Sequence, residues 1–386
     1  MAKGKDAIRS DVGARSPYAL AEAVKKRYIP WDKKSKKEAR TLLKQTLGMP
    51  FDELFDPSLD SPLFRGLPGH TRSGAPESIR AEATPCSTAP TRWYLNANWR
   101  FSLAGVPAGT EYEDPIQGCS LDCHFLGALA AVRFSAPAKL ALDGRPNNTY
   151  NISFYTAPGN SSAVSGANDL PLNVDSFVFA RSRAAGEIWP AVFEKAYAKW
   201  LCTQYHLTHP KPPNCGMCPT DGNADHPTIA GYYGGSPYTA LVNITGMYFA
   251  NGGTSWPMTS LTADQIYTKI FNKCGSVAEG ASQVPMVANT YLNPPGGVVY
   301  GDSTLVGNHT YSVLGVHTEA VGGVSTKFIV LRNPYGKLWG ADPTYGGTLT
   351  LGTGAWLGKA LTTEDGVFAL KVDQFKQYFE RFGWVQ

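Results

Sequence analysis

The chain has 386 residues, a formal net charge of +4, 43% hydrophobic residues, 40 glycines and 28 prolines. At this length a single hydrophobic core usually stops growing, so we expect two packed parts or a domain with an extension. The hydrophobic content excludes disorder over most of the chain. The abundance of Gly and Pro favours a loop-rich globular protein over a helical bundle.

Positive charge is concentrated near the N-terminus, where residues 1–48 hold 13 Lys and Arg against 5 Asp and Glu. We interpret this run as the solvated face of short helices within 21–47, so no nucleic-acid partner is expected. Residues 57–91 are rich in Pro and Gly and predict an extended segment. Together these features define a basic, Pro-rich N-terminal extension, residues 1–90, which has the length to lie across a cleft as an inhibitory segment.

Neither a membrane span nor a secretory signal is visible in the sequence. It has no run of 18 apolar residues, and its first residues lack an apolar core. Seven cysteines without dense spacing predict reduced thiols, one of them a candidate reactive thiol. These observations predict a cytoplasmic protein.

Beyond the extension, the elements change from helical to β-rich along the chain. A buried helix is predicted to begin after Asp122, and apolar spacing predicts a second helix over 188–200, followed by a polar insertion at about 203–230. Alternating patterns then predict strands at 285–291, 309–316, 326–332 and 366–370. The fold class is therefore α+β, with a helical part at 91–235 and a β-rich part at 236–386.

Three polar residues, far apart in the sequence, fit the chemistry of a thiol hydrolase. Cys123 lies at a helix N-terminus, where unsatisfied N–H groups favour a thiolate. His309 begins one predicted strand and Asn333 follows another, so antiparallel pairing would bring a base and the group that orients it together. Gln117 can donate its side-chain amide to an oxyanion beside the Cys123 N–H.

The residues around these positions resemble the calpain family of cysteine peptidases. Gln117-Gly-Cys-Ser-Leu-Asp-Cys123 resembles the family's nucleophile motif, and the segments at 188–199, 308–312, 332–336 and 365–379 follow in the family's order. The likeness covers roughly residues 110–386. It implies a papain-like two-lobed fold, with a helical lobe carrying Cys123 and a β-rich lobe carrying His309 and Asn333. It also implies an endopeptidase that forms a covalent acyl-enzyme on protein or peptide substrates.

The sequence departs from the family pattern at three positions near the site. Leu121, His124 and Tyr335 stand where calpains typically carry Gly, Trp and Trp. We expect Tyr335 to shield the contact between the histidine and the asparagine. Together with Gly234 and Gly235, it is expected to line the substrate cleft.

No cofactor is predicted to be required. The acidic calcium-binding loop of classical calpains is not evident in residues 337–358, which leaves calcium activation an open question. The insertion offers a weak zinc alternative, because Cys215 and Cys218 have the spacing of a zinc half-site and His209 and His226 lie nearby. We favour an insertion without metal, since the spacing is irregular and a second Cys pair is missing.

Two other functions remain open. The departures at Leu121, His124 and Tyr335 are compatible with a catalytically silent peptide-binding scaffold of the same fold. A thioester acyl transferase would use the same intermediate, but transglutaminases resemble a Cys-His-Asp set, and Asn333 favours hydrolysis. Cleavage specificity and oligomeric state are not predicted by the sequence.

Overall fold

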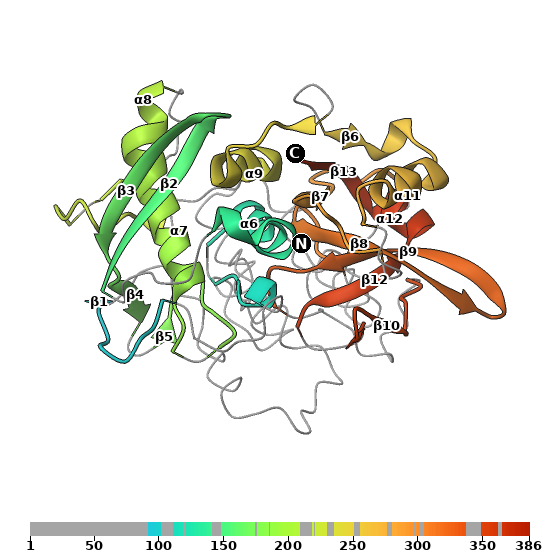
Figure 1. Ribbon diagram of the computed structural model, residues 1–386, viewed down its shortest axis with the longest axis horizontal. Helices are drawn as coiled ribbons and strands as arrows, with labels where there is room; N and C mark the ends of the chain where they lie inside the picture. Colours follow the sequence, from blue (N-terminus) through green and yellow to red (C-terminus); the bar gives the residue numbers. More distant parts are fainter. Residues whose placement is uncertain are drawn as a thin grey trace, which may run out of the picture. The chain divides into compact units, whose positions relative to one another are not determined.

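All residues that the computed structural model describes (Figure 1) lie within one compact unit, Ala89–Gln386. The structure describes residues 92–101, 111–118, 120–140, 148–173, 176–184, 186–208, 218–219, 221–229, 235–250, 255–275, 280–296, 298, 300, 305–336, 349–361 and 365–386. The helices predicted within 21–47 and the extended segment at 57–91 lie outside the described residues. None of the described helices combines the length and the apolar character needed to cross a membrane.

Helix α6 (Cys123–Ser135) is the central element, and its residues from His124 to Val132 are all buried. Small side chains allow this close packing. A Cβ added to Gly127 would lie 3.0 Å from Cγ2 of Thr310, and the Gly127 carbonyl accepts a hydrogen bond of 2.7 Å from Ser312 Oγ. The helix therefore joins a helical region to the sheet that contains Thr310 and Ser312.

The other helices have the capping signals that their sequences predict. Helix α7 (Trp189–Trp200) has Pro190 in its first turn. Helix α9 (Pro237–Thr245) is capped by Ser236, whose Oγ accepts the Thr239 N–H, and ends at the left-handed Gly246. The remaining helices are α8 (His206–Thr208), α11 (Ala263–Phe271) and α12 (Val372–Tyr378), with a π-turn at Leu201–Tyr205 and short 3-10 turns at Glu111–Glu113, Pro137–Lys139 and Met258–Ser260.

The part expected to be mainly helical also contains β structure. Strands β2 (Thr149–Ala157) and β3 (Asn160–Ala167) form an antiparallel hairpin that turns at the left-handed Gly159. Strands β1 (Arg92–Tyr94), β4 (Leu170–Asn173) and β5 (Ser176–Phe177) form a three-stranded sheet. Buried and exposed residues alternate through most of β2, a period-two pattern that sequence analysis overlooked.

The C-terminal half is built on one six-stranded antiparallel sheet in the order β12-β9-β8-β7-β13-β6. Its strands are β6 (Trp256–Pro257), β7 (Met286–Thr290), β8 (Thr310–Val321), β9 (Val324–Arg332), β12 (Val367–Lys371) and β13 (Phe379–Trp384). The predicted strands correspond to β7, β8, β9 and β12. A smaller pair, β10 (Ala355–Trp356) and β11 (Lys359–Ala360), lies outside this sheet.

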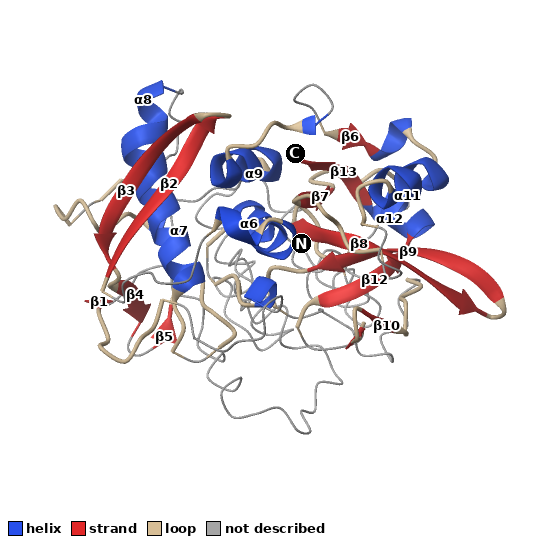
Figure 2. Ribbon diagram, in the orientation of Figure 1, coloured by secondary structure: helices blue, strands red, loops and turns tan. Residues whose placement is uncertain are grey.

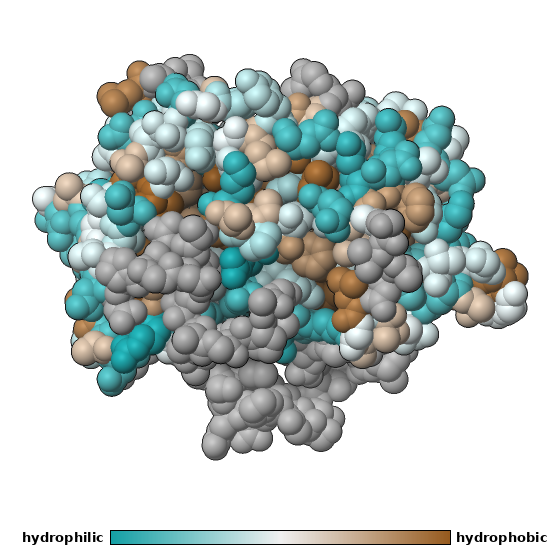
Figure 3. Space-filling model, viewed as in Figure 1, coloured by the Kyte–Doolittle hydropathy of each residue, from teal (hydrophilic) through white to brown (hydrophobic). Residues whose placement is uncertain are grey.

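The described residues form separate hydrophobic clusters, one that includes α6 and one that does not. One is formed mainly by α6, α7, α9 and the β2–β3 hairpin, and another by the six-stranded sheet with α11 and α12. Figure 2 shows this division between a mixed helical region and the sheet, which establishes the α+β class. The surface in Figure 3 is largely hydrophilic, but hydrophobic residues gather at the tip of the β8–β9 hairpin, where Val324 is 67% exposed.

Candidate active site

His309 and Asn333 meet at one edge of the six-stranded sheet. His309 immediately precedes β8 and Asn333 immediately follows β9, and these strands are antiparallel neighbours. Nε2 of the imidazole lies 3.0 Å from Oδ1 of the carboxamide, and both residues are buried. The contact is the one that the sequence predicted.

The surroundings of Asn333 determine which ring nitrogen of His309 carries the proton. The backbone N–H of Tyr335 donates to Oδ1 of Asn333 at 3.0 Å, so this atom is the acceptor of the carboxamide. The imidazole Nε2 must then be the donor, because Oδ1 can only accept. A neutral His309 therefore has its proton on Nε2 and an accepting lone pair on Nδ1.

The His309 ring is held from its backbone and from its face. The backbone N–H of His309 donates to Thr290 Oγ1 at 2.9 Å. The preceding residue, Asn308, adopts a left-handed φ of 52°. Tyr335 stacks on the imidazole with a centroid distance of 4.3 Å and an angle of 14° between the planes. The aromatic ring covers one face of the imidazole, in keeping with the shielding expected from the sequence.

Cys123 is the first residue of α6 and is partly buried. Burial raises the pKa of its thiol to about 11, although a hydrogen bond with the backbone of Thr310 favours the thiolate. Burial likewise lowers the pKa of His309 to about 3. Burial therefore favours the neutral thiol and the neutral imidazole near pH 7 in this conformation.

Gln117 is joined to the turn that carries Asn333. Its backbone N–H donates to the Pro334 carbonyl at 2.9 Å, and its side-chain Nε2 donates to the Ser120 carbonyl at 2.7 Å. The next residue, Gly118, has no room for a side chain, since an added Cβ would lie 2.3 Å from the Phe179 carbonyl oxygen. One amide hydrogen of Gln117 is thus engaged by the Ser120 carbonyl.

Asp122 occupies the N-cap position of α6, but its side chain makes no capping hydrogen bond. It is fully buried and hydrogen-bonds to Glu194 of α7, whose Oε2 accepts the Ala180 N–H at 3.0 Å. Burial raises the pKa of Asp122 to about 6 and that of Glu194 well above its ordinary value. Burial thus favours protonation of this pair of carboxyl groups directly before the thiol, a pairing that sequence analysis missed.

The remaining residues near the proposed nucleophile are packed closely. His124 is buried, and burial lowers its pKa to about 4. Its ring lies against Gly235, where an added Cβ would be 2.5 Å from Nε2. Gly235 is thus positioned beside the N-terminus of α6, whereas Gly234 lies outside the described residues.

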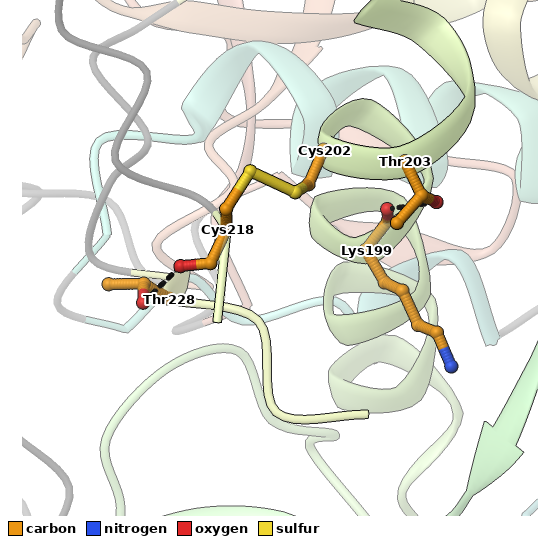
Figure 4. The surroundings of a disulfide bond; sticks show 5 residues. All are labelled: Lys199, Cys202, Thr203, Cys218 and Thr228. Carbon is orange, nitrogen blue, oxygen red and sulfur yellow. Dashed lines mark hydrogen bonds between the residues drawn. A yellow bond between two sulfur atoms is a disulfide. The ribbon is translucent and has the colours of Figure 1, made fainter. Parts of the chain in front are cut away.

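The zinc candidates do not form a metal site in the described part of the chain. Cys218 is in a disulfide with Cys202, which also corrects the expectation of reduced thiols (Figure 4). The nitrogens of His226 contact carboxylates of Asp169 and Asp221 at 2.9 and 2.7 Å. Among the described residues no group of three or more potential ligands gathers, and Cys215 and His209 lie outside them.

The described end of the insertion is attached to α7 by buried charges. Lys195 is completely buried, and its Nζ contacts carboxylates of Asp169 at 2.5 Å and Asp225 at 3.2 Å. Lys199, one turn later, contacts Asp225 at 3.0 Å. Of the two carboxylates that contact His226, Asp169 is therefore also paired with Lys195, which makes it part of a structural ion-pair network.

Sequence comparisons relate the chain to known proteins. Residues 75–217 match the calpain family cysteine protease family. The chain is also 28% identical over 301 residues to a thiol protease of Porphyromonas gingivalis. The alignment covers 69% of this chain and 53% of the relative. The chain thus spans about half the length of that curated relative.

These matches show that part of the chain is similar to calpain family cysteine proteases and that the chain is similar to a thiol protease, in line with the resemblance of its motifs. The matched family segment contains Gln117 and Cys123 and ends before His309 and Asn333.

Proposed function

We propose that the chain is a cysteine endopeptidase that hydrolyses peptide bonds with Cys123 as nucleophile, His309 as base and Asn333 as the residue that orients the imidazole. In this proposal the fold is papain-like, with a helical lobe that carries the thiol and a β-rich lobe that carries the other two groups. The observation that carries it is the 3.0 Å contact between His309 and Asn333. It leaves Nδ1 as the only imidazole nitrogen that can accept the thiol proton.

The reaction follows from these roles. Nδ1 of His309 takes the thiol proton, and the Cys123 sulfur attacks the peptide carbonyl carbon. The oxyanion that forms accepts hydrogen bonds from the Gln117 amide and the Cys123 N–H. His309 returns the proton to the leaving amine as the C–N bond breaks, and water activated by the same imidazole then hydrolyses the thioester.

Proton transfer requires a change in the surroundings of Cys123 and His309. Burial raises the thiol pKa to about 11 and lowers the imidazole pKa to about 3, so the neutral pair is favoured at rest. When the thiolate and the imidazolium form together, each stabilises the other. We infer that substrate binding or admission of water supplies the remaining stabilisation.

The same neutral pair favours the alternative of a silent peptide-binding scaffold, as do the departures at Leu121, His124 and Tyr335. Incubation of the full chain with casein and an amine donor separates the possibilities. Fragments support the peptidase, an unchanged substrate supports the scaffold, and amine incorporation indicates acyl transfer. Labelling by a thiol-directed peptide epoxide should disappear in Cys123→Ala, and labelling that persists would identify a different nucleophile.

No cofactor enters these steps, and we propose that none is required. Equal casein cleavage with a chelator and with added calcium is the expected result. The cytoplasmic location remains a prediction. The Cys202–Cys218 disulfide argues against it, because such bonds persist mainly in oxidising compartments. Mass spectrometry of alkylated peptides from separated cell fractions would decide the compartment.

A further inference from the structure

A pocket of about 560 Å³ lies between α9, the turn after α7 and strand β13. Among its lining residues are Ser236, Tyr238, Thr239, Tyr205, Ser255 and Arg381. Its volume is within the range of small-ligand sites, roughly 300 to 1,000 Å³. None of the steps described above uses it.

The pocket is linked to Cys123 and to His309 through short chains of contacting and neighbouring residues. On one side, Ser236 follows Gly235, which lies against the ring of His124, the neighbour of Cys123. On the other side, the Tyr238 hydroxyl donates to Asn289 Oδ1 at 2.5 Å. Asn289 precedes the threonine whose hydroxyl holds the backbone of His309. These links are the reason for placing a side chain of a bound peptide in the pocket.

The lining has one charged group, Arg381, among neutral hydroxyl, amide and apolar side chains. Its Nη1 donates to Ser255 Oγ at 3.0 Å, and a guanidinium has five N–H donors, so further donors remain for a ligand. A β-bulge in β13 lies between Phe379 and Arg381, and bulges redirect side chains. The intervening Glu380 contacts Asn289 at 3.5 Å and does not line the pocket.

We propose that this pocket is a subsite for an acidic side chain of the peptide substrate, with Arg381 as its specificity-determining residue. The inference rests on the proposed peptidase function. A partly buried guanidinium can bind a carboxylate through two parallel N–H···O bonds, and the surrounding hydroxyls can satisfy its remaining lone pairs. Replacing the carboxylate with a neutral amide would forfeit the ionic part of that interaction.

The test uses the full chain and fluorogenic peptides that differ only by Glu or Gln, scanned over the positions flanking the scissile bond. At one position kcat/KM should be roughly ten- to a hundredfold higher for Glu, the range expected for hydrogen bonds to a charged group. Arg381→Gln should abolish the preference, so that kcat/KM becomes equal for the Glu and Gln peptides. Arg381→Lys should keep part of the preference, and Arg381→Glu should favour Lys at that position. Lys327→Gln, an exposed charge distant in sequence, is the matched control and should keep the preference.

Equal kcat/KM for Glu and Gln at every position, or a preference that survives in Arg381→Gln, would overturn the proposal. If Arg381→Gln loses its cooperative thermal transition, the salt dependence of the Glu preference is measured on the unaltered chain instead. A Glu preference that shrinks between about 0.05 and 0.5 M NaCl supports an ionic contact, and one that does not shrink contradicts it. Failure of the subsite leaves epoxide labelling of Cys123 intact, whereas loss of both labelling and casein cleavage would refute the peptidase function itself.

Discussion

The carboxamide oxygen of Asn333 lies 3.0 Å from Nε2 of His309 and also accepts the N–H of Tyr335. One oxygen atom thus determines both the direction and the tautomer of the imidazole. The backbone of the turn fixes the orientation of the carboxamide, so this orientation does not depend on the contact with the histidine.

Replacing Asn333 with Ala should therefore lower kcat much more than it raises KM. Without Oδ1 the imidazole can rotate and place its proton on the wrong nitrogen, and we expect a loss on the order of a hundredfold, within the range for a positioned base. Steady-state kinetics on one peptide, with the thermal midpoint as a folding control, would measure this. An unchanged kcat in the folded variant would remove Asn333 from the mechanism.

The Tyr335 ring should contribute through stacking rather than through its hydroxyl. Tyr335→Ala exposes one face of His309 and removes an aromatic contact of about 0.5–1.5 kcal/mol, so kcat/KM should fall by a few-fold to tenfold. Tyr335→Trp should retain activity, because a larger ring can still cover the imidazole. If Ala and Trp behave alike, the stacked geometry has no catalytic consequence.

Buried carboxyl pairs should contribute stability at low pH that is lost as the pH rises toward 7. Burial raises the pKa of Asp114, which hydrogen-bonds to Glu187, from 3.8 to about 7, and that of Asp122 to about 6. A raised carboxyl pKa means that the folded state binds more protons than the unfolded state between these values, so this part of the stability is present at low pH and is lost as pH rises. The contribution of these carboxyls to the thermal midpoint should therefore fall between about pH 4 and about pH 7, against an opposing rise from the lowered pKa values of His124 and His309.

Asp114→Asn is the variant that tests this explanation. It keeps the hydrogen-bonding shape without a titrating proton, so the fall of the thermal midpoint across that pH range should become smaller. Asp264→Asn, at an exposed residue, is the matched control and should leave the fall unchanged. A steeper fall in Asp114→Asn would contradict the raised pKa.

Loss of the Cys202–Cys218 disulfide should destabilise the chain without removing the nucleophile. The bond joins residues 16 apart, and closing a loop of this size contributes about 3 kcal/mol to stability. Cys202→Ser should therefore unfold at lower temperature and still react with the epoxide at Cys123. Cys274→Ser, which removes a free thiol, provides the comparison. Equal midpoints for Cys202→Ser and the unaltered chain would refute a stabilising role.

The buried Lys195 should be far more sensitive than its neighbour Lys199. Lys195→Met leaves two carboxylates without their buried cation, and such a loss typically costs about 3–5 kcal/mol. Lys199 retains some exposure, at 16% of its side chain, so Lys199→Met should cost less. Chemical denaturation of both variants compares them directly. Equal losses of stability in the two variants would show that the burial of Lys195 does not increase its contribution.

Much of the site could be predicted from the sequence because its signals are local. The N-terminus of α6 is evident at Asp122 and Cys123, and strand ends mark His309 and Asn333, whose contact then follows from antiparallel pairing. What could not be predicted depends on partners far away in the chain. Nothing near Asp122 indicates that its carboxyl meets Glu194 rather than capping the helix.

The disulfide was missed for the same reason, since the spacing of Cys215 and Cys218 is a local pattern and the true partner, Cys202, lies on another element. The β2–β3 hairpin is a different case. Its alternation was visible in Tyr150, Ile152 and Phe154, but the surrounding helical motifs were given more weight.

The position of β13 in the sheet has a consequence for biosynthesis. β7, whose Thr290 secures the backbone of His309, pairs on its other side with Phe379–Trp384. A nascent chain cannot complete this pairing until those residues have left the ribosome. The thiol and its helix emerge much earlier, so a reactive centre that needs this pairing would not assemble until residues 379–384 had been synthesised.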